Sequence, residues 1–337
     1  MASLESVFDR DLLLSYMPAD PTRLTPFWTS GAFTSDNRVQ RLVASGSQDF
    51  TVPYIMDIDG NLESNYSNTI LTDIAMPRSI EAGKMSGMMA YLNEGFVESN
   101  LTRALTGVEP LRLIAQQITG LWADQAENRA IATVIGVRNH DQANGKALTL
   151  DISKATADAT SKFTADAFID AESTMASRYR GTGVFIVHPK VWALIQKQDA
   201  AAIDQAPSEL GNVRTYRGRA VIESDKGTVI GTGVNAKYVS MLANANSFAA
   251  ESIPNARDLI LSTTEQTGNG GGHVTLWTRR DMLIHPMGFS FNTSAVLTGG
   301  TDEQALSASW SDLTTAANWD MVMGAEKVPF RFLVTNI

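Results

Sequence analysis

The first hundred residues limit the possible fold of this chain most, because they contain no element that could bury their own apolar side chains. Residues 1–102 contain no long amphipathic helix and no regular series of strands. Their apolar groups are short and stand between turn-forming residues, at positions 12–14, 26–28, 50–55 and 70–71. Aromatic and branched residues are too frequent for a disordered segment, and irregular segments of this length are usually functional or linkers. We therefore expect this region to bury its apolar side chains against another copy of the chain.

Composition limits the sites that the chain can build. The 337 residues are 44% hydrophobic and 19% charged, an ordinary composition for a chain long enough for two domains. No cysteine is present, which excludes disulfides and thiolate metal sites. The first residues lack the pattern of a signal peptide, and no apolar run approaches the roughly 18 residues of a membrane span. We expect no membrane partner.

The charge balance bears on the relation to nucleic acid. A net charge of −9 argues against a general affinity for nucleic-acid phosphates. A protein that only encloses nucleic acid has reason to be mildly acidic, because it must not adhere to its contents.

The first hundred residues divide into an arm, an extended loop and the start of a helical region. Residues 50–58 suit a strand, which Pro53 places at a sheet edge, and Asp59-Gly60 is a turn signal. A second strand is expected near residues 68–76, and a weaker helix over residues 85–105.

The clearest element is a long amphipathic helix over residues 109–137. Its apolar residues recur at helical spacing, at Ile114, Ile118, Leu121, Trp122, Ala126, Ala130, Val134 and Val137. Glu109-Pro110 supplies an acid and a proline at the start, and residues 140–146 should end the helix. A helix of roughly 27 residues would be about 40 Å long and would act as a spine.

The rest of the chain predicts an α+β fold, because its helices and strands do not alternate regularly. We expect helices over residues 164–179, from His188-Pro189 onward, and near residues 313–318. The expected strands cover residues 148–152, 183–187, 214–224, 236–243, 272–291 and 328–334.

The histidines do not form a catalytic or metal site by their spacing. His188 precedes a proline at a strand-to-helix corner with no Ser or Asp partner at a recognisable spacing, so we interpret it as a capping or core residue. His140, His273 and His285 are scattered and form no metal-binding pair. We predict no catalytic residue, no metal ligand and no bound cofactor, and therefore no enzyme.

Two glycine-rich segments resemble nucleotide loops only in part. Residues 268–272 (GNGGG) lack the Lys-Ser/Thr of a P-loop and precede a strand, so we expect a simple loop. Residues 231–236 (GTGVNA) match a dinucleotide pattern, but the following residues predict a strand and not the helix that anchors a pyrophosphate.

The order of arm, extended hairpin, spine helix and α+β body resembles the major capsid proteins of tailed bacteriophages, whose fold is shared with herpesvirus capsids. Local motifs are similar to one coat-protein branch of that family. They are residues 111–122 (LRLIAQQITGLW), 183–195 (GVFIVHPKVWALI), 216–222 (YRGRAVI), 312–313 (DL), 318–319 (NW) and 327–330 (KVPF). The resemblance covers most of residues 50–337.

The resemblance implies a division of the chain into four parts. An N-terminal arm would cover residues 1–48 and an extended loop residues 49–84. A peripheral domain would comprise residues 85–150 and 266–337, including the spine helix 109–137, and an axial domain residues 151–265. Some relatives form isopeptide bonds between subunits, but no motif makes Lys84 such a donor.

The leading hypothesis is a capsid protein that self-assembles, as hexamers and pentamers, into an icosahedral shell around double-stranded DNA without sequence-specific binding. Portal, scaffolding or decoration proteins are the further partners that this implies, with assembly in the host cytoplasm and a final place in the virion. One alternative is the shell protein of a bacterial encapsulating nanocompartment, and a second is a soluble enzyme that binds a nucleotide through residues 231–236.

Overall fold

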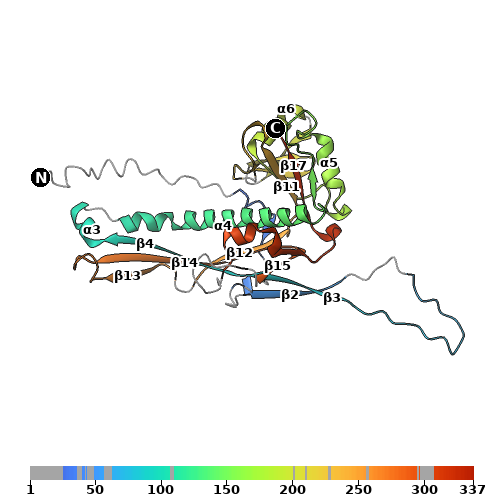
Figure 1. Cartoon of the computed structure of the whole chain (residues 1–337), viewed down its shortest axis with the longest axis horizontal. Coiled ribbons are helices and arrows are strands. Elements are labelled where there is room, and N and C mark those ends of the chain that lie inside the picture. Colours follow the sequence, from blue (N-terminus) through green and yellow to red (C-terminus); the bar gives the residue numbers. More distant parts are fainter. Residues whose placement is uncertain are drawn as a thin grey trace.

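A computed structural model describes residues 26–35, 40, 41, 43, 49–56, 63–106, 110–199, 202–208, 211–226, 229–255, 258–293, 296 and 307–337. A long helix lies along a five-stranded sheet, and a head built on an eight-stranded sheet stands at the C-terminal end of that helix (Figure 1). An extended loop leaves the body and runs away from it. This mixture of helices and sheets agrees with the expected α+β class.

The five-stranded sheet is organised around one long strand. Its members are β1 (Phe33–Thr34), β4 (Ala90–Ser99), β12 (Phe248–Pro254), β13 (Ile260–Thr264) and β14 (His273–Pro286). One edge of β14 pairs antiparallel with β4, while β12 and β13 share the other edge in succession. The short strand β1 adds to β12 in parallel.

The spine helix α4 (Pro110–Ala143) is longer than the predicted span of 109–137. Its buried face is the predicted one and includes Ile118, Trp122, Ala126, Ala130, Val134 and Val137. The segment from His140 was expected to end the helix, but the helix continues to Ala143. It ends where Gly145 and Lys146 adopt positive φ angles of 99° and 56°, a left-handed conformation that follows many helix ends.

The head sheet is assembled from segments distant in the sequence. Its strands are β5 (Thr149–Asp151), β6 (Val184–Val187), β7 (Ile203–Ser208), β8 (Gly211–Tyr216), β9 (Arg219–Glu223), β10 (Val229–Ile230), β11 (Lys237–Ala243) and β17 (Phe330–Thr335). Their order is β5-β17-β11-β6-β9-β8-β7, with β10 on β11. Helices α5 (Ala165–Ser173) and α6 (Pro189–Gln198) belong to the head and contribute to its aromatic core.

Strand pairing changes two of the expected domain boundaries. β12 and β13 lie within residues 151–265 but pair with β14, so they belong to the sheet beside the spine. β17 lies within residues 266–337 but pairs with β11 and β5, so it belongs to the head. The chain passes between the two sheets more often than the expected division into peripheral and axial domains allows.

Two buried arginines hold the head together through backbone carbonyls. Arg331 on β17 donates to the carbonyls of Val328, Phe330, Thr174 and Ala325 at 2.7–3.0 Å. Arg219 on β9 forms an ion pair of 2.9 Å with Glu172 of α5 and donates to the carbonyl of Tyr179. Each guanidinium supplies several donors in a fixed fork, which suits it to satisfying converging carbonyls.

The remaining elements connect these layers. They are β2 (Asp49–Ile55), β3 (Ala82–Met88), α3 (Asn100–Thr106), η2 (Ser177–Tyr179), η4 (Gly233–Asn235), β15 (Phe289–Phe291), α7 (Trp310–Thr314), η6 (Ala316–Asn318), β16 (Trp319–Met321) and η7 (Ala325–Lys327). β2 pairs with β3 and β15 with β16, both antiparallel. Gly136 of α4 lets α7 pack directly on the spine, because a Cβ there would lie 1.8 Å from the Leu313 carbonyl oxygen.

The helix expected over residues 85–105 is wrong for most of its length. The segment forms the end of β3, then β4, and becomes helical only in α3. Two glycines of this segment lie opposite aromatic residues across a strand pair: Gly87 faces Phe50, and Gly95 faces Trp277. The rings lie where a Cβ would otherwise stand, a packing that stabilises glycine in a strand.

The predicted arm of residues 1–48 is too long at its C-terminal side. Phe27 and Phe33 are buried in the main core, and Phe33 stacks on Phe248 with ring centroids 4.7 Å apart. Val43 is buried in a smaller cluster beside Phe50. Residues 26–33 therefore belong to the folded body, and residues 1–25 lie outside the described part of the chain.

Candidate assembly interface

The extended loop consists of a paired stem and a long unpaired excursion. Its stem is the antiparallel pair β2–β3, and residues 63–81 between the two strands form no strand of their own. The strand expected near residues 68–76 is therefore wrong, and the Asp59-Gly60 turn lies outside the described residues. Figure 1 shows the excursion running away from the body.

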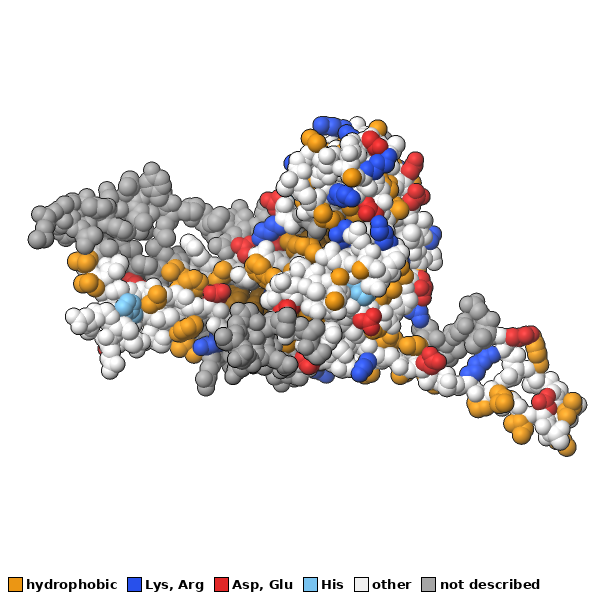
Figure 2. All heavy atoms as spheres, in the orientation of Figure 1, with side chains coloured by type: hydrophobic (Ala, Val, Ile, Leu, Met, Phe, Trp, Pro, Cys, Tyr) orange, Lys and Arg blue, Asp and Glu red, His pale blue; other side chains and the backbone are white. Residues whose placement is uncertain are grey.

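Hydrophobic side chains along this loop are exposed to solvent. They are Ile55, Met56, Tyr66, Ile70, Leu71, Ile74, Met76 and Ile80. Leu71 is 100% exposed and Ile74 83%, so these two side chains gain little or nothing from the body of their own chain. Figure 2 shows such hydrophobic side chains along the extension. A group of exposed apolar side chains on one segment favours an interaction site.

Local hydrogen bonds shape the tip of the loop. The Asn68 side chain accepts from the Ile70 backbone N–H at 2.8 Å, and the Asp73 N–H donates to the Ile70 carbonyl at 3.1 Å. The Asn65 side chain donates to the Met76 carbonyl at 3.1 Å and joins the two sides of the excursion. The tip is a defined turn, with apolar residues on its outside.

The stem is anchored to the body by aromatic residues of β2. Tyr54 covers Gly83 of β3 and donates its hydroxyl hydrogen bond to the Val322 carbonyl at 2.6 Å. Phe50 packs edge-on against the buried ring of His285, with centroids 5.2 Å apart. The loop therefore leaves the body from a fixed base.

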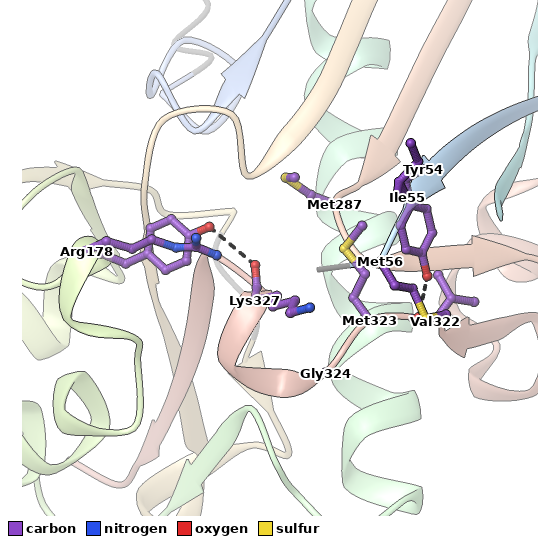
Figure 3. A pocket seen from close by; sticks show the side chains of 10 residues that line it. Tyr54, Ile55, Met56, Arg178, Met287, Val322, Met323, Gly324 and Lys327 are labelled. Carbon is purple, nitrogen blue, oxygen red and sulfur yellow. Dashed lines mark hydrogen bonds between the residues drawn. The ribbon is translucent and has the colours of Figure 1, made fainter. Parts of the chain in front are cut away.

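A groove lies between this stem and the head. Its volume is about 230 Å³, and Figure 3 shows the side chains that surround it. This stem groove is lined by Tyr54, Ile55, Met56, Met287, Val322 and Met323, with the cationic Arg178 and Lys327 on the head side. Arg178 stacks over the Tyr179 ring at 4.7 Å, and Tyr179 donates to the Lys327 carbonyl at 3.4 Å.

A second apolar surface lies at the far end of the five-stranded sheet. Its exposed residues come from β4, α3, β13 and the residue before β13, and are Val97, Leu101, Leu105, Leu259, Ile260 and Leu261. The loop and this end lie on opposite sides of the body (Figures 1 and 2). The chain thus exposes apolar side chains at both extremes of its length.

The histidines occupy separate structural positions. His188 caps α6, where its Nδ1 accepts from the Lys190 backbone N–H at 3.2 Å, as a capping residue should. His140 lies on α4, and His273 and His285 lie near opposite ends of β14. Within the described part of the chain, no group of three or more histidine, aspartate or glutamate side chains could hold a metal ion.

The two glycine-rich segments are connections between strands. Residues 268–272 form the turn between β13 and β14, which confirms the expected loop. The segment 231–236 contains the short helix η4 and leads into β11, so the strand expected after it is present. None of the helices in the described residues has the length and hydropathy of a membrane span.

Comparison with known proteins defines the class of fold. No model of a known protein family matches the chain. The capsid of cyanophage Pam1 superposes with a TM-score of 0.55 over 79% of this chain and 88% of that chain, at 11% identity. The SrpI encapsulin complex of Synechococcus elongatus PCC 7942 aligns with a TM-score of 0.45 over 62% and 74% of the two chains, at 12% identity. The fold is that of tailed-phage major capsid proteins.

A relative in sequence agrees with the fold. The major capsid protein of Bacillus phage SPP1 is 27% identical over 336 residues, which cover 96% of this chain and 95% of the relative. The chain is thus similar over nearly its whole length to a phage major capsid protein, and it shares the fold of tailed-phage capsid proteins. The resemblance expected from the motifs is thereby confirmed.

Sequence reasoning found the loop but missed the stem groove. The groove joins residues 54–56, 178–179, 287 and 322–327, which no local spacing connects. In the sequence, only their methionine content distinguishes these segments from the rest of the chain. Methionine is common in adaptable binding surfaces.

Proposed function

We propose that the chain forms the icosahedral shell of a phage head by assembling with copies of itself as hexamers and pentamers. The observation that carries this proposal is the extended loop, whose apolar side chains find no cover within one copy. Complete burial of each such side chain contributes about 1.5–3 kcal/mol, so the loop favours association strongly. Large obligate interfaces of this kind commonly exceed about 2,000 Å².

The parts of the fold take roles in the shell. The head serves as the axial domain around the capsomer axis, and the spine helix with its sheet serves as the peripheral domain. The loop lies over a neighbouring copy, since an isolated two-stranded hairpin is only marginally stable in water. The protein acts by geometry and catalyses no reaction.

The shell encloses double-stranded DNA without reading its sequence. The net charge of −9 supports this role, because it limits adhesion between the inner surface and the phosphates. Assembly takes place in the host cytoplasm, with portal, scaffolding or decoration proteins as further partners, and involves no membrane.

Electron microscopy of the purified protein, together with size-exclusion chromatography, tests the proposal. We expect capsomers or closed shells of regular diameter. A protein that elutes only as a small oligomer under all assembly conditions would contradict the shell function. Particles from infected cells should contain nuclease-protected DNA, whereas a protein cargo would support the nanocompartment alternative.

A further inference from the structure

We propose that the stem groove of one copy receives apolar side chains from the tip of the extended loop of a neighbouring copy, with residues 70–76 as the segment that supplies them. This proposal rests on the proposed shell function and specifies where the loop docks. Each chain carries both surfaces, the loop tip and the stem groove, and the contact pairs the tip of one copy with the groove of the next.

The groove has the size and lining of a receptor for side chains. At about 230 Å³ it is smaller than the roughly 300–1,000 Å³ typical of small-molecule sites. Three methionines, Met56, Met287 and Met323, face it in Figure 3. Their unbranched side chains adapt to an inserted group better than branched ones do.

The loop tip complements the groove in both polarity and charge. Ile70, Leu71 and Ile74 are exposed apolar residues, and Asp73 is the single charged residue of the segment 70–76. The groove places Arg178 and Lys327 beside its apolar lining. An apolar insertion with one acidic residue therefore meets an apolar groove with a cationic side.

The tip is already shaped for docking. The turn around Asn68 and Ile70 is held by its own hydrogen bonds, so docking orders few further backbone groups. Preorganisation of this kind lowers the entropic cost of binding.

The geometry also requires a second copy as the partner. The tip lies far along an excursion that runs away from the body, while the groove lies at the stem of the same loop (Figure 1). Donor and receptor are different surfaces, so the contact is heterologous and repeats from copy to copy. Heterologous contacts close into rings when the rotation between copies permits it, as a capsomer needs.

Engineered cysteines test this contact cleanly, because the chain has no cysteine of its own. The test variant carries Leu71→Cys and Met323→Cys, and the matched control carries Leu71→Cys and Val234→Cys. Val234 is 83% exposed in the head and lies outside the groove. Assembled shells are oxidised mildly and separated on a non-reducing denaturing gel. A disulfide requires two Cα atoms within about 7 Å, so it reports close approach.

We expect covalent multimers from the test variant and monomers from the control. Shells of the test variant that yield only monomers, whether unlinked or linked within one copy, overturn the docking site and leave the shell function standing. If the unmodified chain forms no shells, the proposed function fails and this proposal fails with it. Should the test variant not assemble, Ile74→Cys with Met287→Cys gives a second pair across the same contact.

Charge exchange gives an independent measurement. Asp73→Lys and Arg178→Glu should each lower the yield of shells, while the double variant should recover it. Lys190→Glu, an exposed change on α6, is the control and should leave the yield unchanged. A double variant that assembles no better than the worse single variant overturns the proposed pairing of tip and groove.

Discussion

Replacing Glu127 should release the segment that leads from the N-terminal residues into the core. Glu127 lies on α4 with 0% of its surface exposed. Its carboxylate accepts hydrogen bonds from two consecutive backbone N–H groups, Phe27 at 3.0 Å and Trp28 at 2.6 Å. In Glu127→Gln, the amide keeps one acceptor but turns an NH₂ group toward the other donor. One buried N–H then lacks a partner, at a cost of about 1–3 kcal/mol.

The substitution Glu127→Gln should loosen the structure locally and should lower the global free energy of unfolding much less. Burial raises the pKa of Glu127, while the two backbone hydrogen bonds oppose that shift. Desolvation of the carboxylate therefore offsets much of the hydrogen-bond energy, and the substitution to glutamine removes the desolvation cost together with one of the two hydrogen bonds. Because the pKa of Glu127 is raised in the folded chain, the unfolded chain ionises first, and the folding stability falls as the pH rises from the unfolded pKa to the folded pKa. We expect the thermal midpoint to change little while the segment 26–33 loosens.

Hydrogen exchange at the amides of Phe27 and Trp28 measures this directly. A loss of about 1–3 kcal/mol corresponds to exchange faster by roughly fivefold to 150-fold. The matched control is Asp124→Asn, one turn earlier on α4, where the carboxylate pairs with Lys226 at 3.0 Å on a partly exposed surface. Exchange at residues 27 and 28 that equals the unmodified rate in Glu127→Gln would refute the role assigned to this carboxylate.

Other perturbations test the spine, the loop base and the N-terminal segment. Gln117→Pro in α4 removes a helical hydrogen bond and should cost about 3 kcal/mol or more, seen as a lower thermal midpoint; normal assembly would contradict a continuous spine. Gly136→Ala places a Cβ 1.8 Å from the Leu313 carbonyl oxygen and should cost about 1–3 kcal/mol in denaturant unfolding; an unchanged unfolding curve would refute the close packing of α7. Burial lowers the pKa of His285 to about 4, so the unfolded chain takes up the proton first as the pH falls. Stability should therefore decline between about pH 6.5 and 4 by up to about 3 kcal/mol, and a variant His285→Phe that shows the same decline would exclude this cause. Deleting residues 1–25 should leave a folded body but misdirect shell formation, whereas deleting residues 1–48 should unfold it by removing Phe27 and Phe33; regular shells from the shorter deletion would contradict the arm's role between copies.

The spine could be predicted because its signal is local. Residues such as Trp122 and Val134 recur with the helical period over many turns, and the core lies on that one face. The end of the helix was placed too early, since His140 and Asp141 are polar but remain helical beside the buried body. Helix ends depend on the conformation of the residues that follow, here Gly145 and Lys146.

Other elements depend on partners distant in the sequence. The segment around Gly87 and Gly95 contains methionine, alanine and leucine and reads as helical by propensity. It becomes two strands because Phe50 and Trp277 cover its glycines from neighbouring strands. β12 was not predicted, since Ala249, Ala250 and Glu251 give no alternating apolar pattern. The apolar loop was visible in the sequence, whereas its receptor groove exists only once four segments have folded together.

The position of β17 has a consequence for synthesis of the protein on the ribosome. This strand contains residues 330–335 of a chain of 337, yet it lies inside the head sheet between β5 and β11. Domains tend to fold from the N-terminus as the chain emerges, but this head lacks an interior strand until residues 330–335 have left the exit tunnel. A chain terminated early also lacks Arg331 and its carbonyl contacts, so it has no complete head to offer a growing shell. The place of β17 inside the head sheet thus restricts assembly to chains that were translated at least through residue 335.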